Sequence, residues 1–286
     1  MHYSVMLSEV LEYLAVRPDG NYLDATTGLG GHSAAIASHL KKGVVIANDR
    51  DATSLEMARQ HCAEWVDRMR FHHGDFASLP EALRGAGIAK VDGVLADFGV
   101  SRYQLTSAER GFSLQTDGPL DMRMDQSQGV TAAEIVNTVD ERQLANLIYE
   151  LGEERQSRRI ARNIVRNRPI RSTLHLAAVV EEVVPRRGRL SPSTQTFLAL
   201  RRAVNEEDGQ LRTFFDVAPG LVKSGGRLVV ISFMSLEDRI AKNRLRDLAR
   251  EGKATVLTRH VVKPSAEELQ ANPASRSAVL RAIELN

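Results

Sequence analysis

Short apolar runs alternate with amphipathic stretches through the first hundred residues of the chain. A helical pattern over residues 4–17 is followed by apolar runs that suit buried strands, and each run leads into a stretch with helical spacing. The runs cover residues 22–26, 44–49, 70–75 and 91–98. This alternation predicts a parallel sheet with helices on both faces.

The alternation stops near residue 101. Helical patterns then follow one another at 131–138, 140–151, 153–167, 173–184 and 193–204. Strand patterns return at 227–233, 255–259 and 278–284, and we expect the last two to pair. The sequence therefore predicts an α/β domain formed by residues 1–105 and 206–286. A helical domain, residues 106–205, interrupts it.

The first strand runs into a glycine turn, which is followed by a helix. The turn contains Gly28, Gly30 and Gly31, and the helix starts at His32. Such a turn aims backbone N–H groups at a nucleotide-type cofactor, although a structural turn has the same composition. The spacing is not the G-x-G-x-x-G of dinucleotide sites, which disfavours a NAD-dependent dehydrogenase. S-adenosylmethionine is therefore the candidate cofactor.

Three other strand ends carry candidate residues at the same predicted edge. Asp49 follows Gly28 by 21 residues, the distance at which an acid reaches ribose hydroxyls, although Asp49 or Asp51 could instead cap the next helix. Phe76 could pack on an adenine ring or in the core. Asp97 ends the fourth strand, where a carboxylate could orient an amine for methylation or hold the amino-acid end of the cofactor.

Composition narrows the class of protein. The 286 residues are 43% hydrophobic and 26% charged, as in ordinary globular proteins. No apolar run reaches the roughly 18 residues of a membrane span, and no secretory signal is visible. The single cysteine, Cys62, excludes an internal disulfide and a cysteine-cluster metal site, and we predict no metal. These features lead us to expect a cytoplasmic protein.

Charge is unevenly distributed along the chain. Residues 153–202 contain twelve arginines against four glutamates, a local balance of +8, whereas the whole chain has a net charge of +2. Within this segment Arg155, Arg159, Arg162 and Arg166 recur at helical spacing. Arginine matches phosphate geometry, so these side chains are candidates for binding a nucleic-acid backbone; a solvated helix face is the alternative.

Several sequence blocks resemble the bacterial 16S rRNA (cytosine-N4)-methyltransferases, the methyltransferase H or MraW type. The blocks include residues 30–33, 109–113, 117–125, 152–155 and 232–239, and the resemblance extends over essentially the whole chain. It implies a Rossmann-like class I methyltransferase sheet with an inserted all-helical domain for substrate recognition. It also implies an S-adenosylmethionine cofactor and 16S rRNA of the small ribosomal subunit as the partner.

The resemblance also assigns cofactor contacts residue by residue. They fall on Gly30, Gly31, His32, Asp49, Phe76, Asp97 and Gln104. Of these, His32 and Gln104 rest on the resemblance alone. Met234 stands where the family usually has histidine, and the segments 99–104 and 190–195 also depart from its pattern. Because these departures lie on the substrate side, they bear on target choice more than on cofactor binding.

The leading hypothesis is methyl transfer from S-adenosylmethionine to N4 of a cytidine in the decoding region of 16S rRNA. Asp97 is the candidate catalytic residue. The alternatives are an RNA-binding ribosome-assembly factor with weak or no catalysis, and an amino-methyltransferase acting on another nucleic acid. A homodimer is compatible with the sequence.

Overall fold

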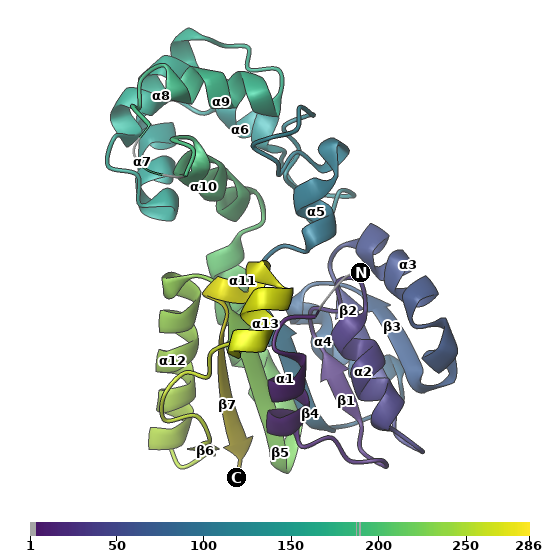
Figure 1. The fold of residues 1–286 in the computed structure, drawn as a ribbon. Coiled ribbons are helices and arrows are strands. Elements are labelled where there is room, and N and C mark those ends of the chain that lie inside the picture. Colours follow the sequence, from purple (N-terminus) through teal and green to yellow (C-terminus); the bar gives the residue numbers. More distant parts are fainter. Residues whose placement is uncertain (1–3, 187, 189) are drawn as a thin grey trace. The chain divides into compact units, whose positions relative to one another are not determined.

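The computed structural model describes residues 4–186, 188 and 190–286, which form two compact units (Figure 1). The first unit combines residues 1–99 with residues 209–286, and the second comprises residues 100–208. The predicted α/β architecture with an inserted helical region is confirmed. The assignment of the helical unit to substrate recognition stays a prediction.

The first unit is built on a seven-stranded sheet in the order β3-β2-β1-β4-β5-β7-β6. Strands β1 to β5 run parallel to one another, whereas β7 is antiparallel to both β5 and β6. The strands are β1 (Tyr22–Asp24), β2 (Val45–Asp49), β3 (Met69–His73), β4 (Val91–Asp97), β5 (Val222–Ser232), β6 (Ala254–Val256) and β7 (Val279–Leu285). The predicted pairing of the last two strands is confirmed.

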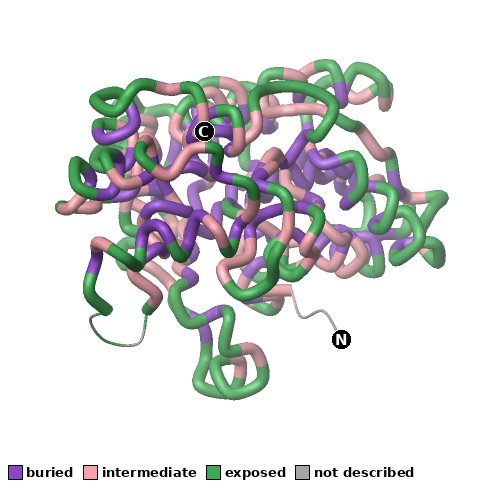
Figure 2. Tube along the Cα trace, turned by 90° about the horizontal axis from the view of Figure 1, so that it is seen from above, coloured by how far each residue is buried: buried purple, intermediate pink, exposed green. Residues whose placement is uncertain are grey.

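Helices cover both faces of the sheet because alternate strand residues point to opposite sides. Leu23, Val94 and Val230 pack on one side with residues of α4, α11 and α12, while Tyr22 and Leu95 pack on the other with α1 and α2. The helices of this unit are α1 (Leu7–Leu14), α2 (Gly31–His39), α3 (Ala52–His61), α4 (Leu79–Gly85), α11 (Glu207–Leu221), α12 (Ser235–Arg250) and α13 (Ala266–Ala271). Figure 2 shows the buried segments in purple and the exposed outer turns in green.

Short polar side chains define where several helices begin. Asp51 accepts hydrogen bonds from two backbone N–H groups at the start of α3, and Asp140 does the same for α7. Thr131 forms a capping box with Glu134 at the start of α6. Such caps satisfy N–H groups that have no partner inside the helix.

The described residues of the second unit form helices around a core of their own. Leu144 and Ile148 of α7 pack with Ile160 and Ile164 of α8 and with Leu176 of α9. The helices are α5 (Arg102–Thr106), α6 (Ala132–Thr138), α7 (Glu141–Gly152), α8 (Ser157–Arg166), α9 (Thr173–Glu181) and α10 (Thr194–Val204). None of the helices in the described part of the chain combines the length and apolar composition that a membrane span needs.

The predicted boundaries differ most from the structure at two places. The helix expected over residues 153–167 begins only at Ser157, so Arg155 lies in the turn before α8 and not on its arginine-bearing face. The reason is local: Glu153 has a left-handed backbone (φ 54°), and the Glu154 carboxylate accepts the N–H of Gln156 at 2.7 Å. The strand expected over residues 227–233 is longer, because β5 already pairs with β4 at Val222.

Candidate active site

The carboxyl ends of parallel strands bring the predicted residues to one edge of the sheet. In the strand register, Asp24 of β1 lies beside Ala47 of β2, and Asp97 of β4 lies beside Ile231 of β5. The glycine turn follows β1 at this edge, and Asp49 ends β2. Crevices at such edges are where ligands bind in open α/β sheets.

The first two glycines of the turn differ in what surrounds them. Gly28 (φ +52°) and Gly30 (φ +85°) both have backbones that favour glycine. A Cβ added to Gly30 would lie 2.7 Å from Cys62 Sγ, whereas one added to Gly28 would meet no atom within 4 Å. Gly30 therefore allows close packing against the end of α3, and Gly28 borders open space. Gly31 is the first residue of α2, and its helix has no side-chain cap.

Asp49 supports the turn directly. One carboxylate oxygen accepts the N–H of Gly28 at 2.6 Å, and the other accepts the N–H of Asp51 at 2.8 Å. Burial raises the pKa of Asp49 to about 6. Since Asp51 caps α3, the alternative interpretation of Asp49 as the cap is removed. Each Asp49 oxygen keeps a second lone pair that could accept a hydrogen bond from a ribose hydroxyl.

Asp97 has an oxygen without a partner. Its backbone N–H donates to Thr26 Oγ1 at 2.6 Å, and its Oδ2 lies 3.9 Å from His32 Nδ1. Its Oδ1 is buried and has no hydrogen-bond partner among the described residues. Burial raises the pKa of Asp97 well above the ordinary carboxyl range, and the charges of Asp24 and Glu237 raise it further. A buried oxygen that lacks a donor is costly unless a ligand supplies one.

His32 is buried beside Asp97. Its Nε2 lies 2.8 Å from the carbonyl oxygen of Val5, which can only accept, so Nε2 carries the proton. Burial lowers the pKa of His32 to about 4. At neutral pH the ring is therefore uncharged, and the lone pair of Nδ1 faces Asp97.

Phe76 lies after β3 in a short 3₁₀ turn, Phe76–Ser78. Asp75 caps this turn by accepting the N–H groups of Ala77 and Ser78. The Phe76 ring packs edge-to-face against Phe98 and Phe214, with centroid separations of 6.2 and 5.2 Å. The side chain is only partly buried, so a ring surface remains for a ligand.

Gln104 belongs to the helical unit, where it lies in the first turn of α5. Its side-chain oxygen accepts the N–H of Ser101 at 2.8 Å, and the Ser101 hydroxyl accepts the Gln104 N–H at 3.2 Å. This capping box gives Gln104 a structural role. Its assignment as a cofactor ligand stays a prediction.

Sequence reasoning missed Asp24. This fully buried carboxylate accepts the Ser33 hydroxyl at 2.6 Å and the Thr26 N–H at 3.2 Å. Burial raises the pKa of Asp24 to about 6. Asp24 thus joins the end of β1 to the first turn of α2 and holds the glycine turn between them in place. The available signal was its position as the last residue of a strand that leads into a glycine turn.

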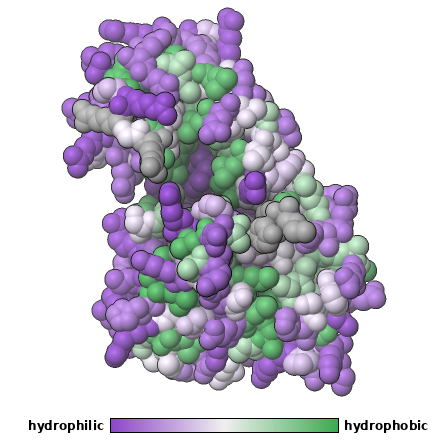
Figure 3. All heavy atoms as spheres, viewed as in Figure 1, coloured by the Kyte–Doolittle hydropathy of each residue, from purple (hydrophilic) through white to green (hydrophobic). Residues whose placement is uncertain are grey.

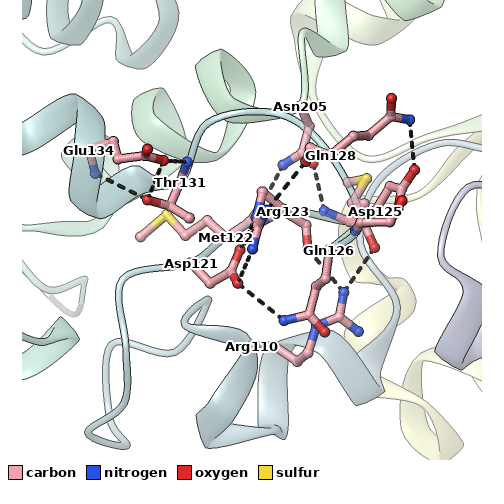
Figure 4. A network of polar contacts seen from close by, with 12 residues as sticks. Arg110, Asp121, Met122, Arg123, Asp125, Gln126, Gln128, Thr131, Glu134 and Asn205 are labelled. Carbon is pink, nitrogen blue, oxygen red and sulfur yellow. Dashed lines mark hydrogen bonds and ion pairs between the residues drawn. The ribbon is translucent and has the colours of Figure 1, made fainter.

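The block at residues 109–125 is folded into a polar network within the helical unit (Figure 4). The buried Arg110 guanidinium donates to the carbonyl oxygens of Arg123 and Met124, both at 3.0 Å. Asn205, from the end of α10, accepts the Met124 N–H and donates to the Met122 carbonyl. The network therefore connects the loop to a helix about eighty residues later in the chain.

The arginine and the carboxylates of this block have separate partners. Arg123 forms a two-point ion pair with Asp121, with N–O distances of 2.8 and 3.0 Å. Asp125 instead accepts the Ser127 hydroxyl and N–H and the Gln128 amide. In this way the side chains of Asp121, Arg123 and Asp125 help to hold the loop in one conformation.

The arginine-rich segment divides into structural and exposed residues. Arg168 donates to carbonyl oxygens at the end of α6, while Arg201 and Arg202 pair with Glu207 and Asp208. Arg162 is exposed and lies 3.4 Å from Glu141. Six further arginines are exposed and have no ion pair among the described residues: Arg155, Arg158, Arg159, Arg166, Arg171 and Arg186. Figure 3 shows mostly hydrophilic side chains at the upper left, where Figure 1 places α7 and α8.

Comparison with known proteins decides the family. A family model described as the MraW methylase family matches residues 1–286. The chain belongs to the MraW methylase family. It is 63% identical over 285 residues to a protein of Solibacter usitatus named "Ribosomal RNA small subunit methyltransferase H", with full coverage of both chains.

More distant relatives with the same printed name support this assignment. The Acidobacterium capsulatum protein is 48% identical and covers 99% of this chain and 98% of its own. The Synechococcus elongatus protein is 47% identical, with coverages of 99% and 94%. This MraW-family protein is therefore an S-adenosylmethionine-dependent methyltransferase.

The sheet edge fits this cofactor. Open space beside Gly28, carboxylate lone pairs on Asp49 and the partly exposed ring of Phe76 lie on successive strand ends. Hydroxyl, amine and aromatic groups of S-adenosylmethionine match these features in chemical type. The unpartnered Oδ1 of Asp97 adds an acceptor for an amine.

Proposed function

We propose that this chain methylates N4 of a cytidine in 16S rRNA of the small ribosomal subunit. The printed names of the relatives support an rRNA target. The observation that carries the chemistry is the buried, unpartnered Oδ1 of Asp97 at the edge that also holds the glycine turn. We place the reaction in the cytoplasm, and a homodimer stays a prediction.

Different residues of the sheet edge would bind different parts of the cofactor. Bound S-adenosylmethionine supplies an electrophilic methyl group. Asp49 would accept hydrogen bonds from its ribose, and Phe76 would pack on its adenine. Gly30, Gly31 and His32 would present the turn and the first residues of α2, with Gln104 contributing from α5.

Asp97 would orient the target amine. The lone pair of a cytosine N4 is delocalised into the ring, so the amine is a poor nucleophile. An N4–H that donates to Oδ1 would hold the nitrogen in position and allow its proton to leave as the new bond forms. The raised pKa of Asp97 makes its carboxylate a better proton acceptor than an ordinary aspartate.

The target cytidine should be unpaired or flipped out, because pairing and stacking in a duplex make its amine inaccessible. Exposed arginines of the helical unit would hold the RNA backbone: Arg159, Arg162 and Arg166 on α8, with Arg155 in the turn before it. Phosphate contacts of this kind position a substrate without reading its sequence.

The decisive test uses labelled S-adenosylmethionine and small subunits from a strain that lacks the family enzyme. We expect label in N4-methylcytidine at one position of 16S rRNA, and loss of label with Asp97→Asn. Asp19→Asn, which changes an exposed carboxylate, is the matched control and should keep activity. Label in another nucleoside would contradict the proposed target, and no label would favour an assembly factor.

A further inference from the structure

A basic groove lies on the first unit, at the margin of the sheet formed by β6 and β7. It has a volume of about 360 Å³ and is bounded by α12 on one side and by β6 and the segment after it on the other. Lys242 and Arg246 of α12, Arg259 after β6 and Arg281 of β7 supply four cationic side chains to its lining.

Three of these cations lack an acidic partner. Within the described ranges, no ion pair involves Lys242, Arg246 or Arg259. Arg281 is committed to Asp238 of α12 through two contacts of 2.6 and 2.9 Å, which neutralises that carboxylate. Unpaired like charges around a concave surface repel one another and create a positive potential that favours an anion.

The floor of the groove does not offset this charge. Leu245 is apolar and buried, and the buried Thr258 hydroxyl accepts the N–H of Ala282 at 3.0 Å. In Figure 3, hydrophilic residues alternate with hydrophobic ones along the lower left, where Figure 1 places α12. The groove thus combines an apolar floor with cationic walls, an arrangement suited to a phosphodiester chain.

The positive surface extends toward the catalytic edge. Arg239, Lys242 and Arg246 follow one another at three- and four-residue intervals, so they share one face of α12. The helix starts at Ser235, just after β5 ends at the edge that holds Asp97. At 1.5 Å per residue, the distance from Ser235 to Arg246 is about 16 Å, comparable to about five nucleotides at 3.4 Å each.

We propose that Arg239, Lys242, Arg246 and Arg259 bind phosphate groups of the RNA strand that flanks the target nucleotide. This inference rests on the proposed function and adds a second contact surface, which is separate from the arginines of α8. The strand would leave the catalytic edge along α12 and enter the groove between α12 and β6.

The test compares two triple variants that each remove three positive charges. Lys242→Gln, Arg246→Gln and Arg259→Gln change the groove. Lys41→Gln, Lys42→Gln and Lys90→Gln change exposed lysines that precede β2 and β4 and do not line the groove. Binding of a fluorescent single-stranded RNA of about 20 nucleotides is measured between 50 and 300 mM salt, with thermal unfolding and cofactor affinity as checks on folding.

We expect the groove variant to bind at least tenfold more weakly at 50 mM salt. The slope of log affinity against log salt should become shallower by about 2, because each phosphate contact on single strands contributes about 0.7. The control should bind within twofold of the unmodified protein. An unchanged slope in the groove variant would overturn the proposal.

Methylation of small subunits by the unmodified protein, measured in parallel, separates this proposal from the proposed function. If the unmodified protein methylates small subunits but the salt slope of the groove variant is unchanged, only the proposal of the groove as an RNA contact is overturned. Groove-dependent binding of RNA without any methylation would overturn the proposed function and leave the groove as an RNA contact.

Discussion

At the scale of single residues, burial determines what the carboxylates of the sheet edge can do. Burial raises the pKa values of Asp24 and Asp49 to about 6, and it raises the pKa of Asp97 well above the ordinary carboxyl range. The oxygens of Asp24 and Asp49 accept hydrogen bonds from residues in and next to the glycine turn, whereas one oxygen of Asp97 has no partner among the described residues. The carboxylate with the free acceptor is therefore the one that a substrate amine could use.

Asp97→Asn should reduce the rate of methyl transfer by about 10²- to 10⁴-fold, the usual range for a general base. It should not destabilise the protein at pH 7. The unfolded chain loses the Asp97 proton near pH 4 and the folded one only at higher pH, so ionisation lowers stability as the pH rises, and asparagine removes that effect. Single-turnover rates and thermal unfolding between pH 4 and 8 check both expectations; an unchanged rate would exclude a catalytic role.

Cofactor affinity should fall as the pH is lowered through 6. Ribose hydroxyls donate to the ionised form of Asp49, and a pKa of about 6 leaves roughly a tenth of it ionised at pH 5. We therefore expect up to about tenfold weaker binding at pH 5 than at pH 7, measured by calorimetry. Asp49→Asn should bind weakly at both pH values; the same pH dependence in that variant would assign the effect to another group.

Gly30→Ala should mainly lower the stability of the fold, whereas Gly28→Ala should mainly weaken cofactor binding. A Cβ at Gly30 would clash with Cys62, so we expect a loss of about 2–4 kcal/mol in unfolding free energy. A Cβ at Gly28 meets open space, so only its left-handed backbone costs stability, about 1–2 kcal/mol, while cofactor affinity drops. Denaturant unfolding and cofactor titration of both variants separate the two roles, and equal affinity losses would argue against them.

At the scale of elements, buried polar groups give a loop the rigidity that helices obtain from their backbone. Residues 109–125 have little regular structure, yet Arg110 and Asn205 satisfy the carbonyl groups of the loop from within. By contrast, α8 buries Ile160 and Ile164 and leaves its arginines exposed. The loop thus depends on one buried cation, and the helix does not depend on its charges.

Arg110→Ala should loosen the loop. It leaves the carbonyl oxygens of Arg123 and Met124 without their donor, at a cost of about 2–4 kcal/mol. Hydrogen exchange over residues 110–125 should become faster, and denaturation of the helical unit should occur at lower denaturant concentration. Arg158→Ala removes an exposed, unpaired arginine and should stay within about 0.5 kcal/mol. Equal effects of the two variants would contradict a special role for Arg110.

At the scale of the whole molecule, each unit has a hydrophobic core of its own. The sheet unit buries two clusters, one on each face of the sheet, and the helical unit buries a third made only of its own residues. The residues of the sheet edge and the loop at residues 109–125 therefore belong to separately packed units of one chain. This separation makes the contributions of the two units measurable one at a time.

Hydrogen exchange with and without S-adenosylmethionine should show where the cofactor binds. We expect protection around residues 26–33, 49, 76 and 97, with additional protection at Gln104 if that residue is a ligand. The helices α7 to α9 should change only when RNA is added. Protection confined to the sheet unit would remove Gln104 from the cofactor site, and no protection at residues 26–33 would contradict the glycine turn as the cradle.

The sequence by itself determined the strand order along the chain, the break near residue 101, the glycine turn and the acids Asp49 and Asp97 at two strand ends. Local periodicity and turn chemistry carry this information, because they depend on neighbouring residues. The prediction that arginines of the segment 153–202 bind a nucleic-acid backbone was the weaker inference. Arg168, Arg201 and Arg202 serve the fold, which composition alone does not show.

Only the tertiary structure decided how each polar group is used. It showed that Gly30 packs against Cys62 whereas Gly28 borders open space, and that Asp51 caps α3. It also showed that Asp24 supports the glycine turn and that one oxygen of Asp97 has no partner among the described residues. It also brought Lys242, Arg246 and Arg259 together across α12 and the margin of the sheet. These properties depend on burial and on contacts between residues distant in sequence, which arise only when the chain is folded.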